Sequence, residues 1–164
     1  MKKKSVRVFS KGMFSLYCKE NKIDDNTVET FNYAIIEILD TNRSKKPFTD
    51  HSNGSNTAIF SKKHPNVLVL SFDDIEKDFV SNGHEYKSMS ERQGKKIFKF
   101  IQNNIDKDKF IVHCRAGISR SGAIGRFIID FLKYKGYYTY FPEHNNICPN
   151  AHVSRILNNL VNKY

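Results

Sequence analysis

The sequence of 164 residues predicts an α/β fold, with a central, mostly parallel sheet of about four to five strands flanked by helices. Three observations support this class: short β-branched runs typical of buried strands, stretches with apolar residues at helical spacing, and the alternation of the two along the chain. Because parallel strands are joined by crossovers, helices are expected on both faces of the sheet. The length suits one domain, so we expect residues 1–164 to form a single unit.

The first half of the chain contains three expected strands and one short helix. Residues 5–10 (SVRVFS) alternate apolar and polar side chains, as a half-buried strand does, and residues 9–21 (FSKGMFSLYCKEN) then indicate a helix. Residues 32–39 (NYAIIEIL) and 66–72 (NVLVLSF) are apolar runs typical of buried parallel strands. Between these two runs, the polar residues 40–56 predict a long loop.

The second half begins with residues 79–87, which we expect to be irregular and polar. Ser88 and Ser90 are each followed three residues later by Glu or Gln, the spacing of a capping box at a helix start. Isoleucines at helical spacing follow, which predicts a helix over about residues 89–104.

The last third contains one strand and two helices. Residues 109–114 (KFIVHC) form a short expected strand, and a helix is expected from about Ser119 to a stop at Gly136. After a polar turn, residues 149–164 (PNAHVSRILNNLVNKY) combine a proline-led start with apolar positions on one face, which indicates a final helix.

The cysteines and the apolar segments of the sequence exclude several classes of protein. The three cysteines, Cys18, Cys114 and Cys148, form no CxxC pair, so neither a zinc site nor a disulfide framework is expected. The N-terminal residues lack the long apolar segment of a signal peptide, and no stretch approaches the length of a membrane span. We therefore expect a cytoplasmic protein in a reducing environment, with no metal or cofactor.

The net charge of +10 suits an anionic partner such as phosphate, nucleic acid or an acidic membrane surface. Lys, Asn and Ile are all abundant, however, and a coding bias would enrich them together. Charge alone therefore assigns no partner.

A single turn carries the chemistry, in the stretch FIVHCRAGISRSGAIGRF at residues 110–127. Cys114 ends an expected strand and a helix follows, which is where α/β sheets bind ligands. The helix dipole, the loop N–H groups and Arg120 favour a thiolate at Cys114. Gly117 lets the backbone curl, and the planar Arg120 fork matches two phosphate oxygens. The turn is therefore interpreted as an anion cradle with a nucleophile at its floor.

Residues 113–121 (HCRAGISRS) match the HC-x5-R-[S/T] loop of the cysteine-dependent protein tyrosine phosphatase superfamily and resemble its small dual-specificity branch. From this composition, roughly 0.005 accidental matches to HC-x5-R are expected in such a chain. By the order of its elements the resemblance covers about residues 60–135 and, more loosely, the whole chain. It implies the fold of that branch and hydrolysis of a phosphate monoester through a cysteinyl-phosphate, with a phosphorylated protein, above all phosphotyrosine, as substrate.

The resemblance also implies a role for each loop residue. Cys114 is the nucleophile, Ser121 donates a hydrogen bond to its sulfur and helps it to leave, and His113 braces the loop. Arg120 and the backbone amides stabilise the equatorial oxygens of the transition state. The side chain of Arg115 is expected to point to solvent. The expected phosphate-binding residues are Arg115, Ala116, Gly117, Ile118, Ser119 and Arg120.

The mechanism requires a general acid to protonate the leaving group, and the stretch SFDDIEKD offers three candidates. Matching strand end to strand end favours Asp74, with Asp73 as second and Asp78 as third choice; one of them is expected to cap the following turn. Forty residues separate Asp74 from Cys114, more than in typical small members of the family. An acid that is protonated while the thiol is ionised predicts a bell-shaped pH profile.

The expected loop at residues 41–57 is interpreted as a wall of the pocket, where Arg43, Lys45 and Lys46 attract phosphosubstrates, or else as a solvated loop with incidental charge. Cys18 and Cys148 are interpreted as structural or incidental thiols.

Other functions remain open at this point. Relatives with the same loop include RNA 5′-triphosphatases and phosphatases of phosphoinositides and inositol phosphates. Nucleic acid is possible but not favoured, because the sequence contains no recognisable RNA-binding motif. A pseudophosphatase that binds phosphopeptides without turnover is the alternative from another class. We expect a monomer.

Overall fold

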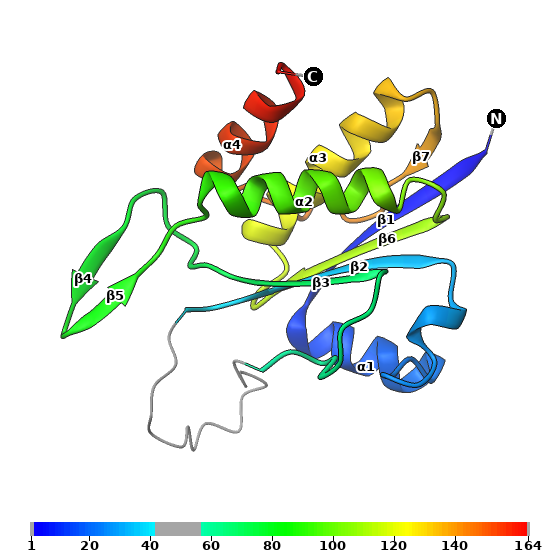
Figure 1. Cartoon of the computed structure of the whole chain (residues 1–164), viewed down its shortest axis with the longest axis horizontal. Helices are drawn as coiled ribbons and strands as arrows, with labels where there is room; N and C mark the ends of the chain where they lie inside the picture. The colour runs from blue at the N-terminus through cyan, green and yellow to red at the C-terminus, as the bar shows by residue number, and fades with distance from the viewer. Residues whose placement is uncertain (1, 42–56, 164) are drawn as a thin grey trace.

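A five-stranded sheet forms the centre of the computed structural model, which describes residues 2–41 and 57–163 (Figure 1). The strands of this sheet are β1 (Lys3–Ser10), β2 (Tyr33–Leu39), β3 (Val67–Ser71), β6 (Lys109–Cys114) and β7 (Tyr138–Tyr140). They lie in the order β3-β2-β6-β1-β7, and each neighbouring pair is parallel. The predicted α/β class with a mostly parallel sheet is therefore confirmed.

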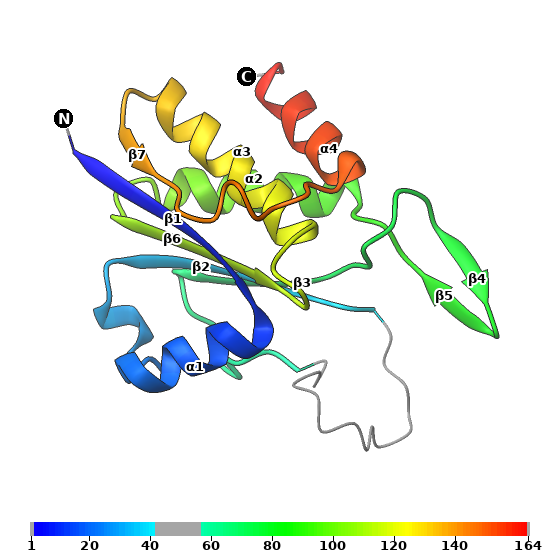
Figure 2. The same cartoon turned by 180° about the vertical axis from the view of Figure 1, so that it is seen from behind.

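Helices cover both faces of the sheet, as expected (Figures 1 and 2). They are α1 (Lys11–Asn21), α2 (Glu91–Asn103), α3 (Arg120–Tyr134) and α4 (Ala151–Val161), with a short 3-10 helix, η1 (Val28–Thr30), after α1. The helix α1 lies on one face, and α2, α3 and α4 lie on the other. Side chains of a strand alternate between the faces, so Val112 enters the core under α3 whereas Ile111 enters the core beside α1.

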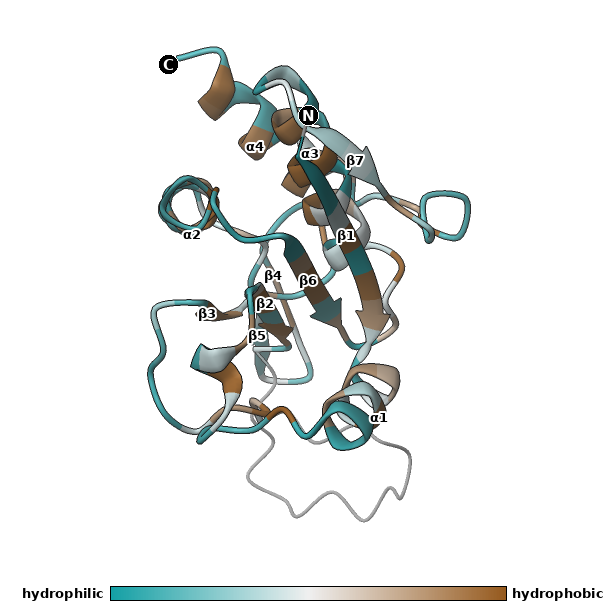
Figure 3. Cartoon of the chain, turned by 90° about the vertical axis from the view of Figure 1, so that its right-hand side faces the viewer, coloured by the Kyte–Doolittle hydropathy of each residue, from teal (hydrophilic) through white to brown (hydrophobic). Residues whose placement is uncertain are grey.

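Hydrophobic residues are concentrated where the sheet is covered (Figure 3). The strand β6 is hydrophobic over its central part, and β1 becomes hydrophobic toward its carboxyl end. The strand β6 is buried along almost its whole length, which explains its apolar sequence, whereas β1 is buried mainly at alternate positions, as its alternating sequence predicts. No helix in the described parts of the chain combines the length and the apolar character that a membrane crossing requires.

The expectation of irregular chain at residues 79–87 was wrong. This segment forms an antiparallel hairpin of β4 (Phe79–Ser81) and β5 (His84–Tyr86). Its turn is Asn82-Gly83, with φ values of 50° and 72°, and Asn-Gly is the strongest short-range signal for such a turn. The dipeptide therefore decides the local structure despite the polar composition.

Two details after Gly136 also differ from expectation. The polar turn contains β7, a three-residue edge strand that pairs with β1. The final helix begins with Asn150 as its N-cap and not with the proline. By contrast, the Ser90 capping box of α2 is present in full, and Ser88 instead donates to Asp78. The predicted loop at residues 40–56 lies mostly outside the described residues.

Candidate active site

The 114–120 loop joins β6 to α3 at the centre of the sheet edge. β6 ends at Cys114 and α3 begins at Arg120. The neighbouring parallel strand β2 and the strand β3 beyond it end at the same edge, so the residues that follow them, Asp40 and Asp73–Asp74, approach this loop. The hairpin of β4 and β5 extends from the same edge (Figure 1).

Gly117 allows the loop to fold tightly against the end of β1. Its φ is +70°, and a Cβ at this position would lie 2.4 Å from the nitrogen of Ser10 and 2.5 Å from the carbonyl carbon of Phe9. The amide of Lys11 also donates to the carbonyl of Arg115, at 3.3 Å. The curl that we expected from glycine is thus required both by backbone conformation and by space.

Cys114 lies at the floor of the loop with little solvent contact. Its side chain is buried, and its Sγ lies 2.9 Å from the Oγ of Ser121 in the first turn of α3. The hydroxyl–sulfur contact that the resemblance implies is therefore present. A hydroxyl at this distance can stabilise a negative charge on the sulfur.

Arg120 is buried, and Phe72 and Asp40 hold its guanidinium group through Nη1. Its Nη1 donates to the carbonyl of Phe72 at 2.8 Å and contacts Oδ1 of Asp40 at 2.6 Å. Its Nε is buried and has no hydrogen-bond partner among the described residues. A guanidinium anchored in this way retains donors for a bound anion, and a buried charged donor without a partner favours one strongly.

The start of α3 has no side-chain cap. The hydroxyl of Ser119, its N-cap residue, donates instead to Oδ1 of Asp74 at 2.7 Å. The amide hydrogens of an uncapped first turn, together with the helix dipole, favour an anion at this position.

Asp74 is the candidate acid that the structure brings to the loop. Besides the hydroxyl of Ser119, the side-chain amide of Asn150 donates to Oδ1 of Asp74 at 2.9 Å. The side chain of Asp74 remains accessible to solvent. It therefore lies beside the 114–120 loop in a position from which it can reach a bound ligand.

The other two candidate acids are engaged elsewhere. Asp73 is buried and accepts hydrogen bonds from the backbone amides of Thr41, at 2.9 Å, and Lys87, at 2.8 Å, as well as from the Thr41 hydroxyl. Asp78 accepts from the amide and the hydroxyl of Ser88, which lowers the pKa of its carboxyl group. Asp73 therefore connects Thr41, which follows β2, with Lys87, which follows β5, and Asp78 holds Ser88 beside the hairpin.

His113 is completely buried beside the loop. Its Nε2 lies 2.9 Å from Oε1 of Glu37, and its ring stacks on Phe14 with 4.7 Å between the ring centres. This arrangement supports the bracing role that we expected for His113. Arg115, in contrast, is exposed, and its Nη1 lies 3.8 Å from Oδ2 of Asp40.

The sequence interpretation missed three polar residues of this region: Asp40, Glu37 and Asn150. A single carboxylate within the apolar run NYAIIEIL is itself a signal that Glu37 must find a buried partner. Asn150 stands directly before a helical pattern, which is the position of an N-cap. For Asp40 nothing local indicates the contact, because it depends on the pairing of β2 with β6. The charged residues Arg43, Lys45 and Lys46 lie outside the described residues.

The two other cysteines differ from Cys114 in their surroundings. Burial, together with the nearby carboxylate of Glu37, raises the pKa of the Cys18 thiol to about 12. Cys148 is exposed, and its backbone amide donates to the carbonyl of Ile118 in the 114–120 loop at 3.0 Å. Within residues 2–41 and 57–163, no His, Cys, Asp and Glu side chains are grouped so that they could hold a metal ion.

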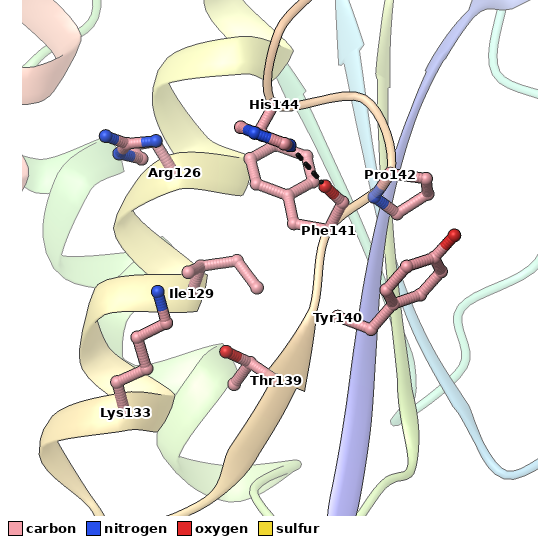
Figure 4. A pocket seen from close by; sticks show the side chains of 8 residues that line it. All are labelled: Arg126, Ile129, Lys133, Thr139, Tyr140, Phe141, Pro142 and His144. Carbon is pink, nitrogen blue, oxygen red and sulfur yellow. Dashed lines mark hydrogen bonds between the residues drawn. The ribbon is translucent and has the colours of Figure 1, made fainter.

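A separate surface hollow lies between α3 and the chain around β7, with Arg126, Lys133, Thr139 and His144 among its lining residues (Figure 4). None of the residues of the 114–120 loop lines it.

Comparisons with protein-family models, with curated proteins and with solved structures find no match to this chain. We therefore infer the function from the geometry of the 114–120 loop.

Proposed function

We propose that this protein is a cysteine-dependent phosphatase of the small dual-specificity type, which hydrolyses phosphate monoesters through a cysteinyl-phosphate. The observation that carries the proposal is the pairing of a buried thiol, Cys114, with the buried and unpartnered Nε of Arg120 across one strand-to-helix turn. A nucleophile and a cation that both face an uncapped helix start suit a phosphoryl group.

In the first step, the thiolate of Cys114 attacks phosphorus, an S–P bond forms, and the bond from phosphorus to the ester oxygen breaks. The free donors of Arg120 and the amides of the loop bind the phosphoryl oxygens, where charge develops in the transition state. The departing oxygen takes a proton from the carboxylic acid of Asp74. The hydroxyl of Ser119 holds this side chain beside the loop by a hydrogen bond.

In the second step, water attacks phosphorus, and Asp74, now a carboxylate, accepts its proton. The P–S bond breaks, and the electron pair returns to sulfur. The hydroxyl of Ser121, 2.9 Å from this sulfur, donates a hydrogen bond to the thiolate as it leaves. Inorganic phosphate is released, and no metal ion takes part in either step.

Phosphotyrosine in proteins is the substrate that we propose. Ile118 supports an aryl ester, because this residue of the 114–120 loop is 45% exposed and offers apolar surface beside the phosphate position. The presence of three free cysteines suits a reducing compartment, so the proposal includes a cytoplasmic location.

The test is phosphate release by the wild type, Cys114→Ser and Cys148→Ser from a phosphotyrosine peptide and from triphosphate-ended RNA. We expect turnover of the peptide by the wild type and by Cys148→Ser, which removes an exposed thiol, and none by Cys114→Ser. Faster release from the RNA would assign the site to the 5′-triphosphatase alternative. If no ester is hydrolysed and the wild type and Cys114→Ser bind the peptide alike, the chain is a binding protein and the proposal fails.

A further inference from the structure

Asn150 connects the last helix to the loop that carries Asp74. Its side-chain Oδ1 accepts a hydrogen bond from the amide of Val153 at 3.0 Å, which caps α4. Its side-chain Nδ2 donates to Oδ1 of Asp74 at 2.9 Å, and its backbone amide donates to the carbonyl of Ser119 at 3.1 Å. The residue is 7% exposed, so these bonds are formed away from solvent. One side chain thus contacts both a helix start and the candidate acid.

Two donors from different elements converge on the same oxygen of Asp74. The hydroxyl of Ser119 lies 2.7 Å from Oδ1 and the amide of Asn150 lies 2.9 Å from it. Among the described residues, Oδ2 of Asp74 accepts no hydrogen bond. A carboxyl oxygen has two lone pairs, so Oδ1 is fully engaged as an acceptor, and the proton of the acid form belongs on Oδ2.

Capping alone does not require asparagine at this position. The starts of α1 and α2 are capped by serines, Ser10 and Ser90, whose hydroxyl oxygens accept the same kind of backbone hydrogen bond. Asparagine supplies a cap oxygen and, on the same side chain, an amide donor that points to another group. At Asn150 this amide donates to the carboxylate of Asp74 at 2.9 Å and, at the longer distance of 3.5 Å, to the carbonyl of Ile75.

We infer that Asn150 is a positioning residue for the general acid: together with Ser119 it binds Oδ1 of Asp74, so that Oδ2 presents the proton to the leaving group. This inference rests on the proposed phosphatase function. It predicts that the loss of the Asn150 amide lowers kcat/KM most for the esters whose leaving group needs a proton in order to depart. A poor leaving group depends on general acid catalysis, whereas an activated phenolate departs without it.

The test compares kcat/KM for phenyl phosphate and for 2,4-dinitrophenyl phosphate in the wild type, Asn150→Ser and Asn150→Asp. Both variants retain an oxygen that can cap α4, and both lose the amide donor. We expect a loss of about 10- to 100-fold on phenyl phosphate, a fraction of the full contribution of a general acid, and a loss of less than about 3-fold on the activated ester.

An equal loss on both esters, or no loss on phenyl phosphate, overturns the inference and leaves Asn150 with a capping role only. If the Asn150 variants melt early, Ser119→Ala applies the same test, because it removes the other donor to Oδ1 and leaves the α4 cap in place. Its loss must likewise depend on the leaving group. Failure of the proposed function is distinguishable, because the wild type would then release no phosphate even from the activated ester, which ends both proposals.

Discussion

Glu37 and His113 form a hydrogen-bonded pair in the interior of the protein, with 2.9 Å between Oε1 and Nε2 and no exposure of either side chain. The carboxylate of Glu37 also accepts hydrogen bonds from the backbone amides of Ile59, at 2.8 Å, and Phe60, at 3.3 Å. The pair therefore links β2 and β6 to the segment that contains Ile59 and Phe60. His113 directly precedes the candidate nucleophile, Cys114, in β6.

Substitution of Glu37 by alanine should destabilise the fold strongly. The change leaves His113 and two backbone amides buried without their acceptor, and removal of one partner from such a cluster costs about 3–5 kcal/mol. Glu37→Gln retains the volume and one acceptor, so its loss should be smaller. Urea denaturation measures both values, with the exposed Glu20→Ala as control. A loss below about 1 kcal/mol for Glu37→Ala would show that the cluster does not hold the fold together.

Gly117→Ala should distort the 114–120 loop, whereas Gly83→Ala should not. Both glycines have positive φ values, 70° and 72°, so both substitutions introduce backbone strain of about 1–2 kcal/mol. Only at Gly117 would the new Cβ collide with backbone, because nothing lies within 4 Å of the position at Gly83. We expect Gly117→Ala to lose both phosphatase activity and more than about 2 kcal/mol of stability in thermal melting. Equal melting temperatures for the two variants would contradict this.

Asp73→Ala should reduce stability more than it reduces the chemical step. Asp73 is buried and accepts hydrogen bonds from Thr41 and from the amide of Lys87, so its removal leaves buried donors unpaired, at a cost of about 1–3 kcal/mol. Asp74→Asn should have the opposite effect, with a fall in turnover of about 100-fold or more on a phenyl ester and little change in melting. If Asp73→Ala abolishes the turnover of well-folded protein while Asp74→Asn does not, the assignment of the acid is reversed.

His64 should make the stability depend on pH near neutrality. Hydrogen bonds to the carboxylates of Asp25 and Glu29, each 2.8 Å from a ring nitrogen, raise the pKa of His64. A raised pKa in the folded state adds stability that is complete below the unfolded value of about 6.5 and is lost as the pH rises through the folded value. The free-energy difference between the wild type and His64→Asn should therefore be largest near pH 6 and decrease at higher pH.

The carboxylate of Asp25 in the same cluster makes the stability depend on pH in the opposite direction, in the acidic range. Hydrogen bonds from Ser61 and from the His64 ring lower the pKa of Asp25. The stability contributed by Asp25 is thus present above its unfolded pKa of about 3.9 and is lost as the pH falls through its folded value. As the control for His64→Asn, His144→Asn removes a ring that hydrogen-bonds to the carbonyl of Phe141 and not to a carboxylate. If the free-energy difference between the wild type and His64→Asn does not change as the pH rises from 6, the ring of His64 is not charged in the folded protein.

The alternation of strands and helices could be predicted because it depends on local periodicity. The apolar runs that form β2, β3 and β6, and the helix α2 that Ser90 caps, follow from apolar spacing and a capping box. The expectation that residues 66–72 form a buried strand was wrong in one respect, because β3 lies at the edge of the sheet, where Leu70 is buried and Val69 is exposed. The hairpin at Asn82-Gly83 depends on an equally local signal. The prediction of irregular chain there relied on the polar composition of residues 79–87 and not on the turn dipeptide. The strand β7 could not be predicted in this way, since three residues become a strand only where β1 offers an unpaired edge.

By itself, the sequence determined the α/β class and the local loop from His113 to Ser121, because each depends on residues that are near neighbours in the chain. The tertiary structure alone decided that Arg120 contacts Asp40 and Phe72. It also decided that Asp74, the acid that strand-end matching favours, lies beside Ser119 and Asn150. The physical reason is strand order: residues distant in sequence meet only when β2, β3 and β6 end at one edge of the sheet.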